Sequence, residues 1–194
     1  MIFIIRHGET KLNVQNVLQG RSNFPLNEKG IEQAEAASAS LKEQGIVFDK
    51  IYSSPLTRAL QTAKIVGGER LPLEVDERLI EMDYGPYEGM DLKKPTPELI
   101  RFFSDFQNNP APRGMEPLEE VVRRSGEFLE AIRKEAEKYT LLISTHAIAM
   151  KGLLEYLTPK SHGAYWSKYI GNCEVYSAEA GKDGYTVPAM FYHP

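Results

Sequence analysis

Two histidines and two arginines stand where short apolar segments give way to helical patterns. They are Arg6 and His7 after residues 2–5, Arg58 after 50–53, and His146 after 141–145. A short run that is apolar throughout is typical of a strand buried on both faces of a sheet. Ligands of open α/β sheets bind at the carboxyl ends of the strands, so we expect these side chains to meet at one sheet edge.

Such a group of side chains suits a compact dianion such as phosphate. Arginine grips phosphate oxygens with two parallel hydrogen bonds, and helix N-termini add oriented N–H groups. Taken singly, each histidine is more often a residue that bonds a turn or the backbone, and each arginine a solvated one. Their shared position at strand ends is what favours a binding site.

The elements that must position these residues alternate along the chain. Short β-rich runs alternate with longer amphipathic helices, a pattern typical of an α/β layer fold. The predicted strands are 2–5, 50–53, 141–145, 174–176 and 186–191, the last two joined by a glycine-rich turn. The predicted helices run from Asn27 to Gly45, from Ser54-Pro55 to Gly67-Gly68, over 98–106, from Glu116-Pro117 onward, and over 147–157.

Helix boundaries follow from capping residues and spacing. Asn27 is a good N-cap, and Ser54 followed by Pro55 is a strong helix start. Ile31, Ala34, Ser38 and Leu41 recur at helical spacing and are expected to face the core. The stretch 71–114 is rich in Pro, Gly and aromatic residues and is predicted to be irregular apart from its one short helix.

Composition narrows the class of protein. The 194 residues are 42% hydrophobic and 26% charged, which is typical of one globular domain. A net charge of −4 and the lack of a basic stripe disfavour nucleic-acid and membrane partners. A single cysteine, Cys173, excludes a disulfide framework. Residues 1–6 do not form a signal peptide and no apolar run approaches bilayer-spanning length, so a cytoplasmic location is expected.

Several segments together resemble the histidine phosphatase superfamily, also called the phosphoglycerate mutase-like family. They are Arg6-His7-Gly8-Glu9-Thr10, Asn13, Gln19-Gly20, Pro25-Leu26, Gly30, Gln33-Ala34, residues 53–63, Glu81, Gly85, Glu88-Gly89 and Thr145-His146. The resemblance covers most of the chain in the right order. It implies a three-layer α/β/α sandwich with a mostly parallel central sheet, in a single domain of residues 1–194. A lid or substrate-pocket segment is expected near 84–114.

The resemblance also implies roles for individual residues. His7 would attack phosphorus in line and become phosphohistidine, which requires a neutral ring whose proton sits on the far nitrogen, held by a backbone acceptor. Arg6, Arg58 and His146 would bind the phosphate oxygens and stabilise charge in the transition state. Two arginines and a histidine already supply positive charge, so no metal and no other cofactor is expected.

Further residues are expected around this centre. Asn13 would add a hydrogen bond to phosphate, and Gln19, Gly20 and Tyr84 would bind substrate. Glu81 would protonate the leaving oxygen and then deprotonate the attacking water. Asp83 and Glu88 lie close in sequence and remain alternatives for that role, although Glu88 is expected to cap backbone N–H groups of a loop.

Aromatic residues form a separate group. They are Tyr84, Tyr87, Phe102, Phe103, Phe106, Tyr165 and Trp166. They could line a pocket for the leaving group, whereas the phenylalanines are expected to pack a lid onto the domain.

Two sequence features favour a phosphatase over a mutase of the same family. The segment 90–114 is short and has no adjacent arginine pair, and Ala147-Ile148 stands where a mutase shows Gly-Asn. A non-catalytic binding domain of this fold is a third alternative, disfavoured because the set Arg6, His7, Arg58, Glu81 and His146 is intact. The expected partner is a small phosphate ester: a sugar phosphate, ribazole phosphate, a phosphoglycerate or a broad range. The oligomeric state stays open, a dimer included.

Overall fold

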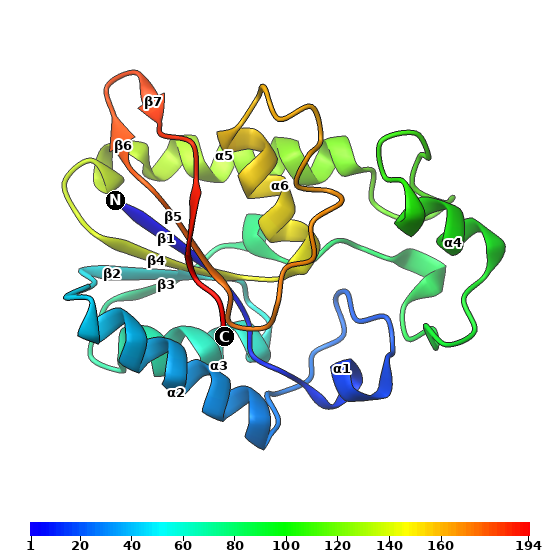
Figure 1. Cartoon of the computed structure of the whole chain (residues 1–194), viewed down its shortest axis with the longest axis horizontal. Coiled ribbons are helices and arrows are strands. Elements are labelled where there is room, and N and C mark those ends of the chain that lie inside the picture. The colour runs from blue at the N-terminus through cyan, green and yellow to red at the C-terminus, as the bar shows by residue number, and fades with distance from the viewer.

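A six-stranded sheet forms the middle layer of the computed structural model, which describes residues 1–194 (Figure 1). Its strands are β1 (Ile2–Arg6), β2 (Lys50–Ser53), β3 (Leu73–Val75), β4 (Leu141–Thr145), β5 (Val175–Ala178) and β8 (Ala189–Tyr192), in the order β3-β2-β4-β1-β5-β8. The first four pair in parallel, whereas β5 pairs antiparallel with both β1 and β8. In the β1–β4 register Arg6 lies opposite Thr145, so His7 and His146 leave the sheet side by side.

Helices cover both faces of this sheet (Figure 1). α2 (Glu28–Glu43) and α3 (Thr57–Gly67) lie on one side, and α5 (Leu118–Ala136) and α6 (Ala147–Leu157) lie on the other. Strand side chains alternate between the faces, so Ile2 and Ile4 pack with α5 and α6 while Phe3 and Ile5 pack with α2 and α3. This two-sided burial explains why β1 is apolar throughout, and it confirms the predicted three-layer α/β/α fold with a mostly parallel sheet.

The helix boundaries agree with the predicted caps in all but one case. Asn27 caps α2, its Oδ1 accepting from the Gly30 N–H at 2.7 Å, and Gly68 ends α3 with φ +96°. The predicted start of α3 at Ser54-Pro55 is wrong, because the helix begins at Thr57 after Leu56. The Ser54 hydroxyl accepts from the Leu56 N–H at 3.3 Å in the turn before the helix and is also hydrogen bonded to His146.

A second correction concerns the buried face of α2. Ile31 is 38% exposed and does not face the core as predicted. The buried positions are Gly30, Ala34, Ala37, Ser38 and Leu41, a stripe of small residues closed by one leucine. Small side chains let α2 pack closely against α3, which leaves the larger Ile31 on the flank.

Several short elements were not predicted. β3 and the 3₁₀ turns Glu77–Leu79 and Gly85–Tyr87 fall in the stretch expected to be irregular, and α1 (Lys11–Gln15) follows β1. A two-stranded hairpin of β6 (Ala180–Gly181) and β7 (Gly184–Tyr185) stands between β5 and β8.

α4 (Pro97–Ser104) lies beyond one end of the sheet (Figure 1). It packs through its own apolar cluster, in which Leu99 and Phe102 meet Met82, Ile148 and Trp166. None of the helices has the length and apolar character that crossing a membrane requires.

Candidate active site

His7 lies directly after β1 and is 4% exposed. Its Nδ1 is 2.7 Å from the Gly8 carbonyl oxygen, and its Nε2 accepts a hydrogen bond from Arg58 Nε at 3.1 Å. Because a carbonyl can only accept, Nδ1 carries the ring proton and Nε2 presents its lone pair. Burial, followed by the charges of Arg58 and Arg6, holds the pKa of His7 well below its ordinary value. The ring is therefore neutral and its proton is held by a backbone acceptor, the state expected of a histidine that attacks phosphorus.

Arg58 is fully buried in the first turn of α3. Besides His7, its guanidinium donates to the Ser22 carbonyl at 2.7 Å and to the Gly20 carbonyl at 2.6 Å. Burial lowers the pKa of Arg58 to about 10, which still leaves it a cation near neutral pH. The backbone of residues 20–22 thus fixes the plane of the guanidinium beside His7.

Glu88 fixes the backbone of residues 20–22. Its carboxylate accepts from the Gly20 and Ser22 N–H groups, at 3.0 Å and 3.2 Å, and from the Ser22 hydroxyl. A β-carbon at Gly20 would stand 2.6 Å from a Glu88 oxygen and 2.7 Å from the Met82 carbonyl, so only glycine fits. Glu88 caps backbone N–H groups of a loop as predicted, and Gly20 contributes backbone groups that hold Arg58.

His146 and Arg6 complete the basic group. His146 is fully buried, its ring centroid is 5.1 Å from that of His7, and its Nε2 is 2.7 Å from Ser54 Oγ. Burial and the charge of Arg58 hold the pKa of His146 well below its ordinary value, so it is neutral in the free protein. Arg6 donates one guanidinium N–H to the Ile170 carbonyl. The structure therefore brings Arg6, His7, Arg58 and His146 together at one sheet edge.

Seven buried side-chain nitrogen and oxygen atoms have no hydrogen-bond partner; the four oxygens belong to Ser125, Thr158, Glu174 and Tyr176, whereas all three nitrogens belong to predicted site residues. They are Arg6 Nε, His146 Nδ1 and Gln19 Nε2. Gln19 is anchored through its other amide atom, Oε1, which accepts from Thr10 Oγ1 at 2.7 Å. Buried polar groups without partners are rare in folded proteins and commonly mark a functional site. The three nitrogens suit the oxygens of an anion held in front of His7.

Glu81 is a buried carboxylate whose charge acts on Arg58. It is 3% exposed, and it accepts from the N–H groups of Ala149 at 2.9 Å and Ile148 at 3.2 Å. It therefore caps the N-terminus of α6, directly after His146. Asp83 instead forms a salt bridge with Arg21 at 3.1 Å on a surface where 43% of its side chain is exposed. Of the three predicted alternatives, only Glu81 contacts the helix that follows His146.

Asn13 and Tyr84 are placed less directly. Asn13 Oδ1 accepts from the Thr10 N–H at 3.0 Å in a capping box at the start of α1, which leaves its Nδ2 to donate elsewhere. Tyr84 is 4% exposed, packs edge-to-face with Phe103 at 6.4 Å between centroids, and has its pKa raised by burial. Most of the Tyr84 ring belongs to the apolar cluster under α4.

Sequence reasoning missed three residues that support the site. Ser54 bonds His146, and Thr62 Oγ1 accepts from the Gly8 N–H at 3.1 Å. Asn172 Nδ2 donates to the His7 carbonyl at 3.0 Å. Ser54 and Thr62 fall within the segment 53–63 that carried the resemblance, so a signal was present, whereas no sequence feature pointed to Asn172.

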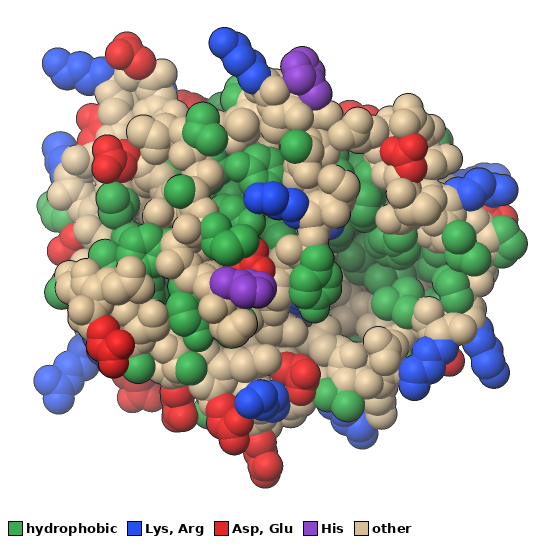
Figure 2. Space-filling view, viewed as in Figure 1, with side chains coloured by type: hydrophobic (Ala, Val, Ile, Leu, Met, Phe, Trp, Pro, Cys, Tyr) green, Lys and Arg blue, Asp and Glu red, His purple; other side chains and the backbone are tan.

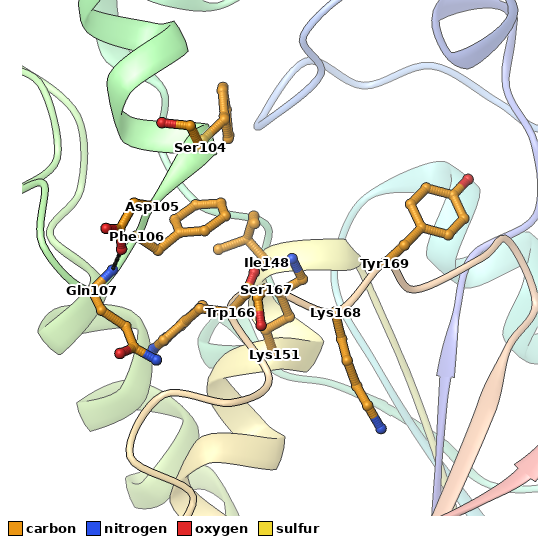
Figure 3. Close-up of a pocket in the computed structure, with 11 residues that line it drawn as sticks. Ser104, Asp105, Phe106, Gln107, Ile148, Lys151, Trp166, Ser167, Lys168 and Tyr169 are labelled. Carbon is orange, nitrogen blue, oxygen red and sulfur yellow. Dashed lines mark hydrogen bonds between the residues drawn. The ribbon is translucent and has the colours of Figure 1, made fainter.

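A cavity of about 410 Å³ lies against α6 (Figure 3), and its lining residue Ile148 donates its N–H to Glu81. Its walls come from the end of α4, from α6 and from residues 166–169; they include Phe103, Phe106, Ile148, Lys151, Trp166 and Tyr169. The surface is hollowed beside the α4 region, and hydrophobic side chains line the hollow (Figure 2). No cluster of three or more His, Cys, Asp or Glu side chains is arranged to hold a metal ion.

The chain is similar to known phosphatases and mutases. The chain is 29% identical over 170 residues to phosphoserine phosphatase 1 of Hydrogenobacter thermophilus, which covers 86% of this chain and 80% of that protein. It is 30% identical to a 2,3-bisphosphoglycerate-dependent phosphoglycerate mutase of Bradyrhizobium diazoefficiens, covering 82% and 83%. The chain spans only 51% of the length of longer mycobacterial relatives that it matches over 94% of its own residues.

A solved structure supports the same assignment. YhfR of Bacillus stearothermophilus superposes with a TM-score of 0.83 at 31% identity, covering 96% of this chain and 94% of that one. Residues 2–192 match the family described as the histidine phosphatase superfamily, branch 1. The relatives of this chain are phosphatases or mutases. The chain belongs to the histidine phosphatase superfamily.

Proposed function

We propose that this protein is a metal-independent phosphatase that hydrolyses phosphate monoesters through a phosphohistidine on His7. The observation that carries the proposal is a neutral His7 in contact with Arg58 and near Arg6 and His146, together with three unpaired buried nitrogens on Arg6, Gln19 and His146. A phosphate group has the oxygens to satisfy these nitrogens.

The first half-reaction transfers the phosphoryl group to the protein. His7 Nε2 attacks phosphorus, so the N–P bond forms as the P–O bond to the leaving group breaks. Arg58 Nε exchanges its bond to His7 for one to a phosphate oxygen, while Arg6 and His146 bind the others. The dianion would raise the pKa of His146, since an opposite charge favours the protonated ring.

The second half-reaction returns the site to its starting state. Glu81 gives a proton to the leaving oxygen in the first step, and then takes one from the water that attacks the phosphohistidine. Hydroxide from that water ends on phosphorus, the N–P bond breaks, and inorganic phosphate leaves. Because His7 Nδ1 stays bonded to the Gly8 carbonyl, the ring keeps the same tautomer throughout.

Hydrolysis is favoured over mutase chemistry by what borders the site. A mutase must bind the carboxylate and the outer phosphate of its substrate as well as the phosphate that reacts. Residues 90–114 offer no adjacent arginine pair for this purpose. The segment 84–114 acts as the wall or lid of the leaving-group pocket. The mutase relative leaves phosphoglycerate a candidate substrate, alongside sugar phosphates, ribazole phosphate and phosphoserine.

The test is hydrolysis of p-nitrophenyl phosphate in excess EDTA by the wild type, His7→Ala and His162→Ala. His162 lies outside the site and serves as a matched control. We expect activity that survives the chelator, is lost in His7→Ala and persists in His162→Ala. An acid-labile phosphoenzyme should form in the wild type and in His162→Ala, and should be absent in His7→Ala.

Three outcomes would contradict the proposal. Activity abolished by EDTA and restored by a divalent cation would make the enzyme metal-dependent. Full activity in His7→Ala would remove the phosphohistidine. Phosphoglycerate mutase activity without phosphatase activity would assign the alternative chemistry.

A further inference from the structure

Lys151 is a buried cation that the mechanism above does not use. It lies on α6, about one helical turn beyond the Ile148 and Ala149 N–H groups that Glu81 caps, and is 8% exposed. Its ammonium donates to the Trp166 carbonyl at 2.8 Å and stands 5.1 Å from the centroid of the Phe106 ring. Lysine is almost never buried to this degree unless it is paired with an acid.

Lys151 takes part in none of the salt bridges; the Glu81 carboxylate lies near enough for its charge to act on the ammonium, but no acid contacts it directly. Burial lowers its pKa to about 8, so the side chain is still mostly protonated at neutral pH. An ammonium has three N–H groups, and the Trp166 carbonyl uses one of them. The remaining donors, and a positive charge that no acid contacts directly, suit an anion from outside the chain.

The other charged groups on the cavity wall do not compete for this role. The Asp105 carboxylate accepts from the N–H groups of Gln107 and Asn108 within its own turn. The Lys168 ammonium lies 5.3 Å from the centroid of the Tyr165 ring, and Figure 3 shows its side chain extending away from the other lining residues. Lys151 is therefore the cation that a molecule in the cavity would meet.

Two contacts join this cavity to the candidate active site. Ile148 lines the cavity, and its N–H donates to Glu81 Oε2 at 3.2 Å. The segment 166–169 forms the opposite wall and leads to Ile170, whose carbonyl accepts from Arg6. A leaving group whose bridging oxygen meets Glu81 would thus extend along α6 toward Lys151.

We propose that Lys151 selects phosphate esters whose leaving group carries a carboxylate, an inference that rests on the phosphatase function above. A single ammonium with no acid in direct contact matches a monoanion better than the dianion of a second phosphate. The aromatic walls formed by Phe103, Phe106 and Trp166 suit a short carbon skeleton between the two charged ends. The substrate class is a phosphorylated hydroxy acid or amino acid.

The experiment compares two substrates that differ only at the position in question. 3-Phosphoglycerate and glycerol 3-phosphate share a three-carbon skeleton, with a carboxylate in the first where the second has a hydroxymethyl group. We expect the wild type to prefer 3-phosphoglycerate on the order of 10- to 100-fold in kcat/KM, the effect of a charged hydrogen bond. Lys151→Met should reduce that ratio to about 1, chiefly through KM, and Lys151→Arg should restore part of it.

Lys168→Met is the matched control, because it removes a lysine from the same cavity wall and should leave the ratio unchanged. A wild type without preference, or a Lys151→Met variant that loses activity equally on both substrates, would overturn the proposal. Hydrolysis of p-nitrophenyl phosphate reports on the proposed function separately. If that reaction is absent, titration calorimetry measures the affinity of the protein for 3-phosphoglycerate and for glycerol 3-phosphate. The expected ratio of the two affinities is the same as that given for kcat/KM.

Discussion

Replacing Lys151 by methionine should make the protein more stable at neutral pH, although it removes a hydrogen bond. The pKa of Lys151 is about 8 in the folded protein, against 10.5 for an unperturbed lysine. At about 1.4 kcal/mol per pKa unit, keeping the buried ammonium charged costs about 3 kcal/mol at pH 7. Methionine has a similar length and no charge, and losing the bond to the Trp166 carbonyl forfeits about 1 kcal/mol. The net gain is about 2 kcal/mol, or a Tm higher by roughly 4 to 8 °C.

The same reasoning predicts how the gain depends on pH. Between pH 8 and 10.5 the unfolded chain binds more protons at this lysine than the folded chain does. The free energy of unfolding of the wild type therefore rises with pH through that window. By pH 10 the penalty at Lys151 has fallen below about 1 kcal/mol, so the wild type and Lys151→Met should be about equally stable.

Urea denaturation of the wild type, Lys151→Met and Lys168→Met at pH 7 and pH 10 measures this difference. Lys168 is exposed, so its variant should track the wild type at both pH values. The reasoning is refuted if Lys151→Met is clearly less stable than the wild type at pH 7. It is also refuted if the difference between the two does not shrink as the pH rises.

Three further predictions concern the site and its frame. Glu81→Gln should slow hydrolysis of alkyl phosphates on the order of 100-fold, and p-nitrophenyl phosphate much less because nitrophenolate leaves without a proton; equal rates on alkyl phosphates would remove Glu81 from the mechanism. Glu88→Ala should free residues 20–22 and lower kcat/KM about 10-fold without unfolding the protein, which parallel kinetics and circular dichroism would show. Gly30→Ala would place a β-carbon 2.1 Å from the Glu9 carbonyl oxygen, so urea denaturation should reveal a loss of about 1 to 3 kcal/mol, and unchanged stability would contradict the close approach.

The parts of the fold that could be predicted are those set by local sequence. The apolar run 2–5 directly indicates a strand buried on both faces. Asn27 caps α2 by accepting from the N–H of Gly30, only three residues along the chain. The meeting of Arg6, His7, Arg58 and His146 followed from one topological rule, that parallel strands end at a common edge.

The remaining features depend on contacts between distant segments. Ser54 has the chemistry of an N-cap, and its hydroxyl accepts from the Leu56 N–H, but it also bonds His146, far along the chain, and α3 starts later. β3 is a three-residue edge strand with one neighbour, so it carries no clear alternation. Lys151 looks like the polar position of an amphipathic helix until Trp166 and Phe106 cover it. No local pattern encodes such a partner.

The central position of β1 also determines when this enzyme can become active during its synthesis. The strand that carries His7 pairs with β4, at residues 141–145, and with β5, at residues 175–178. At synthesis rates of about 5 to 20 residues per second, β1 waits roughly 10 to 30 s for these partners to leave the ribosome. Contacts of such long range also slow the folding of the completed chain. Until then an apolar strand is exposed on both edges, a clear target for a chaperone, and the proposed nucleophile cannot act before β5 has been made.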